Sequence, residues 1–172
     1  DEARQQVDET LYAVKDVGLP VLWFWPNVDA GADGTSSGIR AYREQHEPRH
    51  IHFFKNMGSL DFLKLLYNSR CLIGNSSVGI RECSFLGVPV VNIGTRQMGR
   101  ERGVNVADTP HDREQITAAI RAHLSNGRYP TDLLYGDLFD SLGSACRSSY
   151  GVPGYLPAKA FFACLAQREF PT

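Results

Sequence analysis

Short runs of apolar residues alternate with longer amphipathic segments over most of the chain. The apolar runs, together with shorter segments of the same character, predict strands at 21–25, 50–54, 71–73, 88–93 and 104–107. Between these strands apolar residues recur at helical spacing, which predicts helices at 2–17, 37–45, 59–67, 78–86 and 110–126. Strand and helix therefore follow one another in turn.

Strands that alternate with helices and are apolar throughout are typical of a parallel sheet with helices on both faces. We therefore predict an α/β fold, a doubly wound Rossmann-like parallel sheet, formed by residues 1–137. The pattern weakens from residue 138, where Gly, Ser and Pro become frequent. We expect residues 138–172 to form a divergent C-terminal tail with one helix at about 157–168.

The composition narrows the choice of function. The chain has 172 residues, is 42% hydrophobic and carries a formal net charge of -1. It suits one well-buried core and offers no bulk attraction to nucleic acid or to a membrane surface. No apolar run is long enough to cross a bilayer, and the cysteines show no C-x-x-C spacing, which favours reduced, buried thiols. We expect a cytoplasmic protein that uses no cofactor.

Polar residues follow several of the predicted strands. Ligands of doubly wound sheets bind at the carboxyl ends of the strands, so these residues are expected to share one crevice. They are Asn27, Lys55, Ser76, Ser77 and Arg96. Asn27 has a second interpretation, because Asn also favours turns for purely structural reasons.

The strongest chemical signal comes from the ends of two successive strands. Ser76 and Ser77 offer hydroxyls and backbone N–H groups at the start of a helix, which suits a phosphate. Arg96 adds a guanidinium that can bind phosphate through two N–H donors. Each has a structural alternative, because serines commonly cap helices and Arg96 shares a charged loop with Arg100 and Arg102. Together they favour a nucleotide-diphosphate site.

Other polar residues are less decisive. Glu82, near the start of the same helix, either accepts hydrogen bonds from ribose hydroxyls or interacts favourably with the helix dipole. His50 and His52 alternate along a strand without a third ligand at metal spacing, so no metal site is predicted. A P-loop and the G-x-G-x-x-G motif are both absent from the sequence. The chain offers a binding site more clearly than an acid/base pair.

Four segments carry a resemblance to a known family. They are PNVDAG (26–31), IGNSSVGIRE (73–82), GVPVVNIGTRQMGRERG (87–103) and YPTDLLYGD (129–137). They resemble the C-terminal domain of the UDP-N-acetylglucosamine 2-epimerases and are most similar to the hydrolysing branch. The resemblance implies one half of a two-domain fold of the glycosyltransferase-B type, with a UDP-sugar between two Rossmann-like domains. The family's N-terminal catalytic domain has no counterpart in this sequence.

The resemblance also implies roles for single residues. Ser76, Ser77 and Arg96 would bind the diphosphate, and Glu82 would bind the ribose. Arg96 and the helix N-terminus would also stabilise charge on the departing diphosphate.

Two further positions and the chemistry follow from the same resemblance. Asn27 would face the cleft near the sugar or diphosphate, and the strand end at Lys55 would approach the uracil. The family's reaction is loss of UDP to give a glucal-like intermediate, followed by addition of water to yield N-acetylmannosamine. The groups that move protons belong to the N-terminal domain.

We therefore interpret the chain as the UDP-binding C-terminal domain of a hydrolysing UDP-N-acetylglucosamine 2-epimerase that serves sialic acid or polysaccharide synthesis. The expected partners are UDP-N-acetylglucosamine or UDP, the N-terminal domain of the parent enzyme and further copies in a homo-oligomer. The chain alone should be inactive. The open alternatives are a non-hydrolysing 2-epimerase, a glycosyltransferase domain of the same architecture and a non-enzymatic UDP-sugar-binding module.

Overall fold

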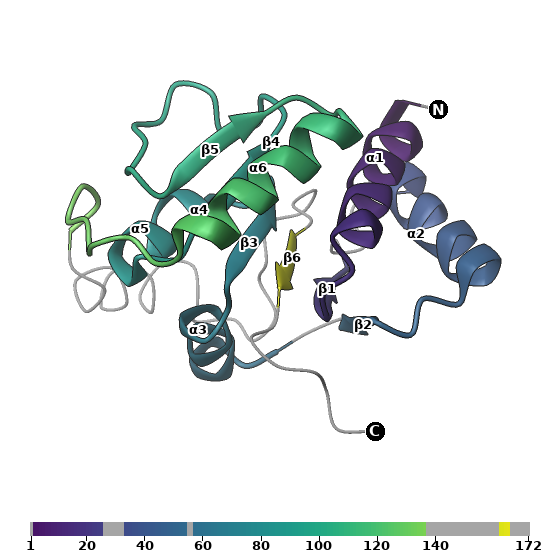
Figure 1. The fold of residues 1–172 in the computed structure, drawn as a ribbon, viewed down its shortest axis with the longest axis horizontal. Coiled ribbons are helices and arrows are strands. Elements are labelled where there is room, and N and C mark those ends of the chain that lie inside the picture. Colours follow the sequence, from purple (N-terminus) through teal and green to yellow (C-terminus); the bar gives the residue numbers. More distant parts are fainter. Residues whose placement is uncertain (1, 26–32, 55–56, 137–161, 166–172) are drawn as a thin grey trace.

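A six-stranded sheet organises the described part of the chain (Figure 1). The structure, a computed structural model, describes residues 2–25, 33–54, 57–136 and 162–165. The strands are β1 (Val21–Phe24), β2 (Ile51–Phe54), β3 (Cys71–Gly74), β4 (Val90–Ile93), β5 (Val106–Thr109) and β6 (Phe162–Leu165). The helices are α1 (Glu2–Val17), α2 (Asp33–His46), α3 (Ser59–Tyr67), α4 (Ser77–Ile80), α5 (Glu82–Leu86) and α6 (Arg113–Asn126).

The order of the strands across the sheet is β2-β1-β6-β3-β4-β5. The pairs β1–β2, β3–β4 and β4–β5 are parallel, whereas β6 is antiparallel to both of its neighbours. The predicted α/β, Rossmann-like fold is therefore confirmed. The expected purely parallel sheet is corrected to a mixed, mostly parallel one.

β6 takes the place of part of a predicted helix. The sequence predicted a helix at about 157–168, but Phe162–Leu165 forms a strand between β1 and β3. The other residues of that range lie outside the described residues. Cys164 and Leu165 are both fully buried, on opposite faces of the sheet. A short segment that is apolar on both faces suits a central strand, and periodicity alone cannot distinguish such a strand from a buried helix.

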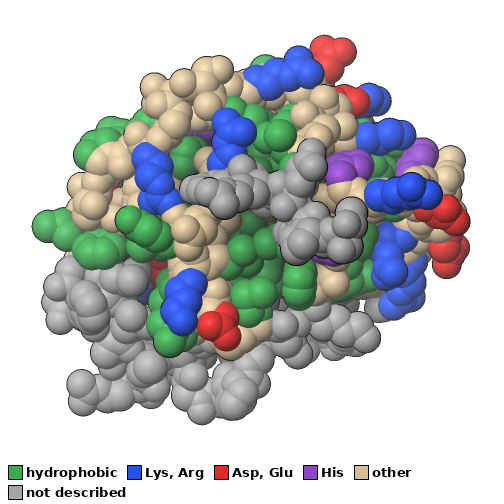
Figure 2. All heavy atoms as spheres, turned by 60° about the horizontal axis from the view of Figure 1, so that its bottom comes forward, with side chains coloured by type: hydrophobic (Ala, Val, Ile, Leu, Met, Phe, Trp, Pro, Cys, Tyr) green, Lys and Arg blue, Asp and Glu red, His purple; other side chains and the backbone are tan. Residues whose placement is uncertain are grey.

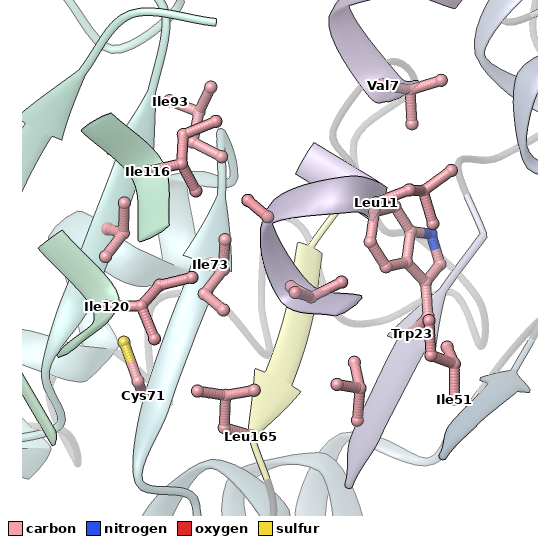
Figure 3. Close-up of a cluster of buried hydrophobic side chains, with 14 of the residues drawn as sticks. Val7, Leu11, Trp23, Ile51, Cys71, Ile73, Ile93, Ile116, Ile120 and Leu165 are labelled. Atoms are coloured by element: carbon pink, nitrogen blue, oxygen red, sulfur yellow. The ribbon is translucent and has the colours of Figure 1, made fainter. Parts of the chain in front are cut away.

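Successive side chains of the strands pack into two separate cores. On one face, Trp23 of β1 and Ile73 of β3 pack with α1, α2 and α6, which contribute residues such as Leu11 and Ile116 (Figure 3). On the other face, Phe24 and its neighbours pack with α3, α4 and α5. Helices therefore cover both faces of the sheet, as the sequence predicted.

α2 begins earlier than its sequence suggested. The sequence predicted a helix from residue 37, after a Gly/Ser-rich segment, yet the helix starts at Asp33. Small residues here allow a close approach to α1, because a Cβ added at Gly38 would lie 2.6 Å from Cγ1 of Val7. Packing against α1 therefore outweighs the low helix propensity of Gly and Ser.

Two other predicted helices also have different bounds. The helix predicted at 78–86 is interrupted at Arg81, so α4 and α5 are separate short helices. α6 begins after Asp112, whose carboxylate accepts a hydrogen bond from a backbone N–H of the first turn at 2.8 Å. The helix predicted from residue 110 therefore begins three residues later, and Thr109 is the last residue of β5.

The cysteines of the described residues are core side chains. Cys71, Cys83 and Cys164 are free and buried, as predicted, whereas Cys146 lies outside the described residues. Burial raises the pKa of all three described thiols, and that of Cys164 reaches about 12. These thiols are therefore protonated at neutral pH.

The described surface has mixed character. On the face drawn in Figure 2, Lys and Arg side chains (blue) are interspersed with acidic, polar and apolar ones. Within the described ranges, none of the helices combines the length and apolar character needed to cross a membrane.

Candidate functional site

Two polar segments meet at the carboxyl edge of the sheet. Ser76 and Ser77 follow the end of β3, and Arg96 follows the end of β4. Because β3 and β4 are parallel neighbours, both ends lie at the same edge (Figure 1). A hydrogen bond of 2.8 Å from Gln97 Nε2 to the backbone oxygen of Asn75 joins the two segments. The structure therefore brings these predicted residues into one region.

The serine turn, residues 75–77, connects β3 to α4. Ser76 is 4% exposed, and its Oγ accepts a hydrogen bond from the backbone N–H of Val78 at 3.4 Å. The helix-capping interpretation is therefore confirmed for Ser76, although a capping hydroxyl can still donate its own hydrogen. Ser77 is partly exposed and begins α4. Because α4 is a single short turn, an anion here would depend on hydroxyl and N–H donors more than on a helix dipole.

The arginine loop, residues 94–103, follows β4 and carries exposed guanidinium groups. Arg96 and Arg100 lie close enough to influence one another: partial burial and then the charge of Arg100 lower the pKa of Arg96. Within the described residues neither guanidinium forms an ion pair with a carboxylate. Adjacent positive charges without a counter-ion favour the binding of an anion, which would relieve their repulsion.

Arg102 has a different role from the other arginines of this loop. Its Nε donates to Oδ2 of Asp108 at 3.1 Å and forms an ion pair with that carboxylate. The buried Asn92 donates to Oδ1 of Asp108 at 2.6 Å. The charge of Arg102 is therefore neutralised within the protein. The basic cluster of the arginine loop therefore consists of Arg96 and Arg100.

Gln97 belongs to the site through its contact with Asn75, which could not be predicted from the sequence. Its side chain is 3% exposed although it lies in a charged loop. Its Oε1 is buried and has no hydrogen-bond partner among the described residues. Gln97 and Asn75 are 22 positions apart, so no local pattern signals their contact. The available hint is an uncharged amide placed directly after Arg96.

The structure gives less information on the other predicted site residues. Glu82 is 9% exposed, begins α5 and already interacts with other groups of the protein. Asn27 and Lys55 lie outside the described residues. The strands that precede them end in register at Phe24 and Phe54, at the same edge as β3 and β4.

The described part of the site offers donors and positive charge. Hydroxyls, backbone N–H groups and guanidiniums suit a ligand that carries phosphate. A metal is a different matter: within the described ranges, His, Cys, Asp and Glu form no group of three or more that could hold an ion. His52 is exposed, and partial burial lowers the pKa of His50.

Known proteins resemble this sequence over most of its length. The family model for UDP-N-acetylglucosamine 2-epimerase matches residues 1–138. The chain is 30% identical over 115 residues to UDP-N-acetylglucosamine 2-epimerase of Neisseria meningitidis serogroup B, which covers 67% of this chain and 29% of the relative.

Two further relatives carry more specific names. UDP-N,N'-diacetylbacillosamine 2-epimerase (hydrolyzing) of Legionella pneumophila is 31% identical over 137 residues, covering 80% of this chain and 36% of the relative. GDP/UDP-N,N'-diacetylbacillosamine 2-epimerase (hydrolyzing) of Campylobacter jejuni is 46% identical over 56 residues, covering 33% of this chain and 15% of the relative.

The matched region thus spans 29% and 36% of the Neisseria and Legionella proteins. The family match includes both segments of the site, the serine turn and the arginine loop, and most of the Rossmann-like sheet that carries them. A family model that matches residues 1–138 of a chain with this fold establishes that the chain belongs to the UDP-N-acetylglucosamine 2-epimerase family.

Proposed function

We propose that the chain is the UDP-binding C-terminal domain of a hydrolysing UDP-N-acetylglucosamine 2-epimerase. The diphosphate lies between the serine turn and the guanidinium of Arg96. The observation that carries this proposal is the pair of charges Arg96 and Arg100, which have no ion-pair partner among the described residues and lie on a loop that is hydrogen-bonded to the serine turn. A guanidinium can donate two parallel hydrogen bonds to phosphate, and the turn supplies further donors.

The rest of the nucleotide follows from the position of the diphosphate. Glu82, at the start of α5, accepts hydrogen bonds from the ribose hydroxyls. Asn27 faces the sugar or diphosphate, and the strand end at Lys55 approaches the uracil. The common edge at which β1 and β2 end supports these two positions, because it is also the edge of the serine turn.

The parent enzyme would convert UDP-N-acetylglucosamine and water to N-acetylmannosamine and UDP. As UDP departs, negative charge grows on the phosphate oxygen that leaves the sugar, and Arg96 stabilises this charge. The described part of the site offers no acid/base pair, so proton transfer is assigned to the N-terminal domain of the parent. This chain alone is therefore expected to be inactive.

The relatives' names bear on the type of epimerase. The Legionella and Campylobacter proteins are named as hydrolysing enzymes, which supports the hydrolysing reaction. The Neisseria protein is named simply as a 2-epimerase, so a non-hydrolysing reaction is the second candidate. Labelled UDP-N-acetylglucosamine distinguishes them in the parent enzyme, because hydrolysis releases a free sugar and simple epimerisation keeps it on UDP.

Titration of UDP into the chain, monitored by calorimetry, tests the proposed site. Arg96→Ala should weaken UDP binding about tenfold or more, because hydrogen bonds to charged groups contribute roughly 1.5–3 kcal/mol. The matched control is Arg121→Ala, which removes the same charge from an exposed position on α6 and should leave UDP binding unchanged. Equal UDP affinities of the Arg96→Ala chain and the unmodified chain would contradict the proposal.

A further inference from the structure

Gln97 connects the two segments of the proposed diphosphate site. We infer that Gln97 is a positioning residue: it holds the Arg96 end of the arginine loop against the serine turn through Asn75, without touching the nucleotide itself. This inference rests on the proposed function, because the benefit of the connection is a pre-arranged phosphate site. Its physical basis is the 2.8 Å hydrogen bond from Gln97 Nε2 to the Asn75 backbone oxygen.

Gln97 is buried and its neighbour Met98 is exposed, which is the opposite of the usual arrangement of polar and apolar side chains. The amide is 3% exposed, whereas the apolar side chain of Met98 next to it is 73% exposed. Burying an amide is unfavourable unless hydrogen bonds replace its water, and Oε1 of Gln97 has no partner among the described residues. An apolar side chain of the same size would fill this space at lower cost. The connection to Asn75 is therefore the feature that requires an amide.

The arginine loop is held at its other end by separate contacts. Arg102 is bonded to Asp108, and Tyr135 Oη donates to the backbone oxygen of Glu101 at 2.9 Å. These contacts fix residues 101–102. The Gln97 bond fixes the end of the loop that carries Arg96.

A fixed loop improves binding because less freedom is lost when the ligand arrives. Arginine is a long side chain, and ordering it together with a mobile loop would reduce the net affinity. With the loop already joined to Asn75, binding of phosphate needs to order the Arg96 side chain alone. Gln97 therefore affects UDP affinity through the position of Arg96.

Gln97→Met tests this prediction, because Met has nearly the same shape and cannot donate to Asn75. We expect UDP affinity to fall about fivefold, the usual effect of one buried hydrogen bond. In an Arg96→Ala chain the same change should cause little further loss, because the two residues act on one interaction. Thr117→Val is the matched control: it removes another 2.8 Å side-chain-to-backbone bond, within α6, and should not alter UDP affinity.

A second measurement needs no nucleotide. Amide hydrogen exchange at residues 95–100 should be faster in the Gln97→Met chain than in the unmodified chain, and unchanged in Thr117→Val. If Gln97→Met does not fold, Gln97→Leu replaces it. Leucine also cannot donate to Asn75 and places no charge in this buried position. UDP affinity should again fall, and exchange at residues 95–100 should again be faster than in the unmodified chain.

The outcomes separate the two proposals. Unchanged UDP affinity in the Gln97 variants, unchanged loop exchange, or losses that simply add to that of Arg96→Ala overturn the role of Gln97 while UDP binding itself stands. Failure of the unmodified chain to bind UDP overturns the proposed function, and the role of Gln97 with it.

Discussion

At the scale of single residues, the arginine loop depends on glycines with different surroundings. Gly94 and Gly99 have φ values of +75° and +81°, which side chains disfavour. A Cβ added at Gly94 would lie 2.5 Å from Nε2 of His111, whereas one added at Gly99 would meet no atom of the described residues within 4 Å. Gly94 is therefore required for its backbone conformation and also for the space that His111 occupies.

This difference gives a prediction with its own control. Gly99→Ala should lower the free energy of unfolding by about 1 kcal/mol, the usual cost of a left-handed conformation. Gly94→Ala should lower it by roughly 1–3 kcal/mol more, because His111 must also move. Urea unfolding followed by circular dichroism measures both. Equal losses in the two variants would mean that the His111 contact is unimportant.

The candidate site was partly predictable at this scale. Ser76, Ser77 and Arg96 could be found because each follows an apolar run that ends a strand. The contact between Gln97 and Asn75 could not, because it depends on how two strand ends meet in space. The ion pair between Arg102 and Asp108 could not be predicted either, because the carboxylate belongs to the next strand.

At the scale of elements, the sequence was most informative where a strand is buried on both faces. β1, β3 and β4 are buried along their whole length and stand out as apolar runs, interrupted only by Asn92 of β4. The same criterion failed for β6, because a short apolar run is also compatible with a buried helix. The start of α2 was missed because its contact with α1 is tertiary and has no local signature.

The position of β6 can be tested through Cys164, which is fully buried in that strand. Cys164→Asp should lower the free energy of unfolding by about 3 kcal/mol or more, because it places an unpaired charge within the core. Cys164→Ala, which removes the thiol without adding charge, should cost about 1–2 kcal/mol. Urea unfolding would show equal stability for both variants if residue 164 lay in solvent.

At the scale of the whole molecule, the serine turn lies beside the part of the sheet where the direction of winding changes, with β6 between β1 and β3. From β1 the chain proceeds outward to β2, and from β3 it proceeds outward in the opposite direction to β4 and β5. In doubly wound sheets, ligands bind outside the carboxyl ends of the strands at such a switch point. The serine turn directly follows β3, beside this point. The topology thus supports the same location as the residues do.

A crystal structure of the chain with UDP tests the central claim most directly. We predict that the diphosphate oxygens lie within hydrogen-bond distance of Ser77 and of the Arg96 guanidinium, at the carboxyl ends of β3 and β4. UDP bound at any other place, or density for no nucleotide at saturating UDP, would contradict the account.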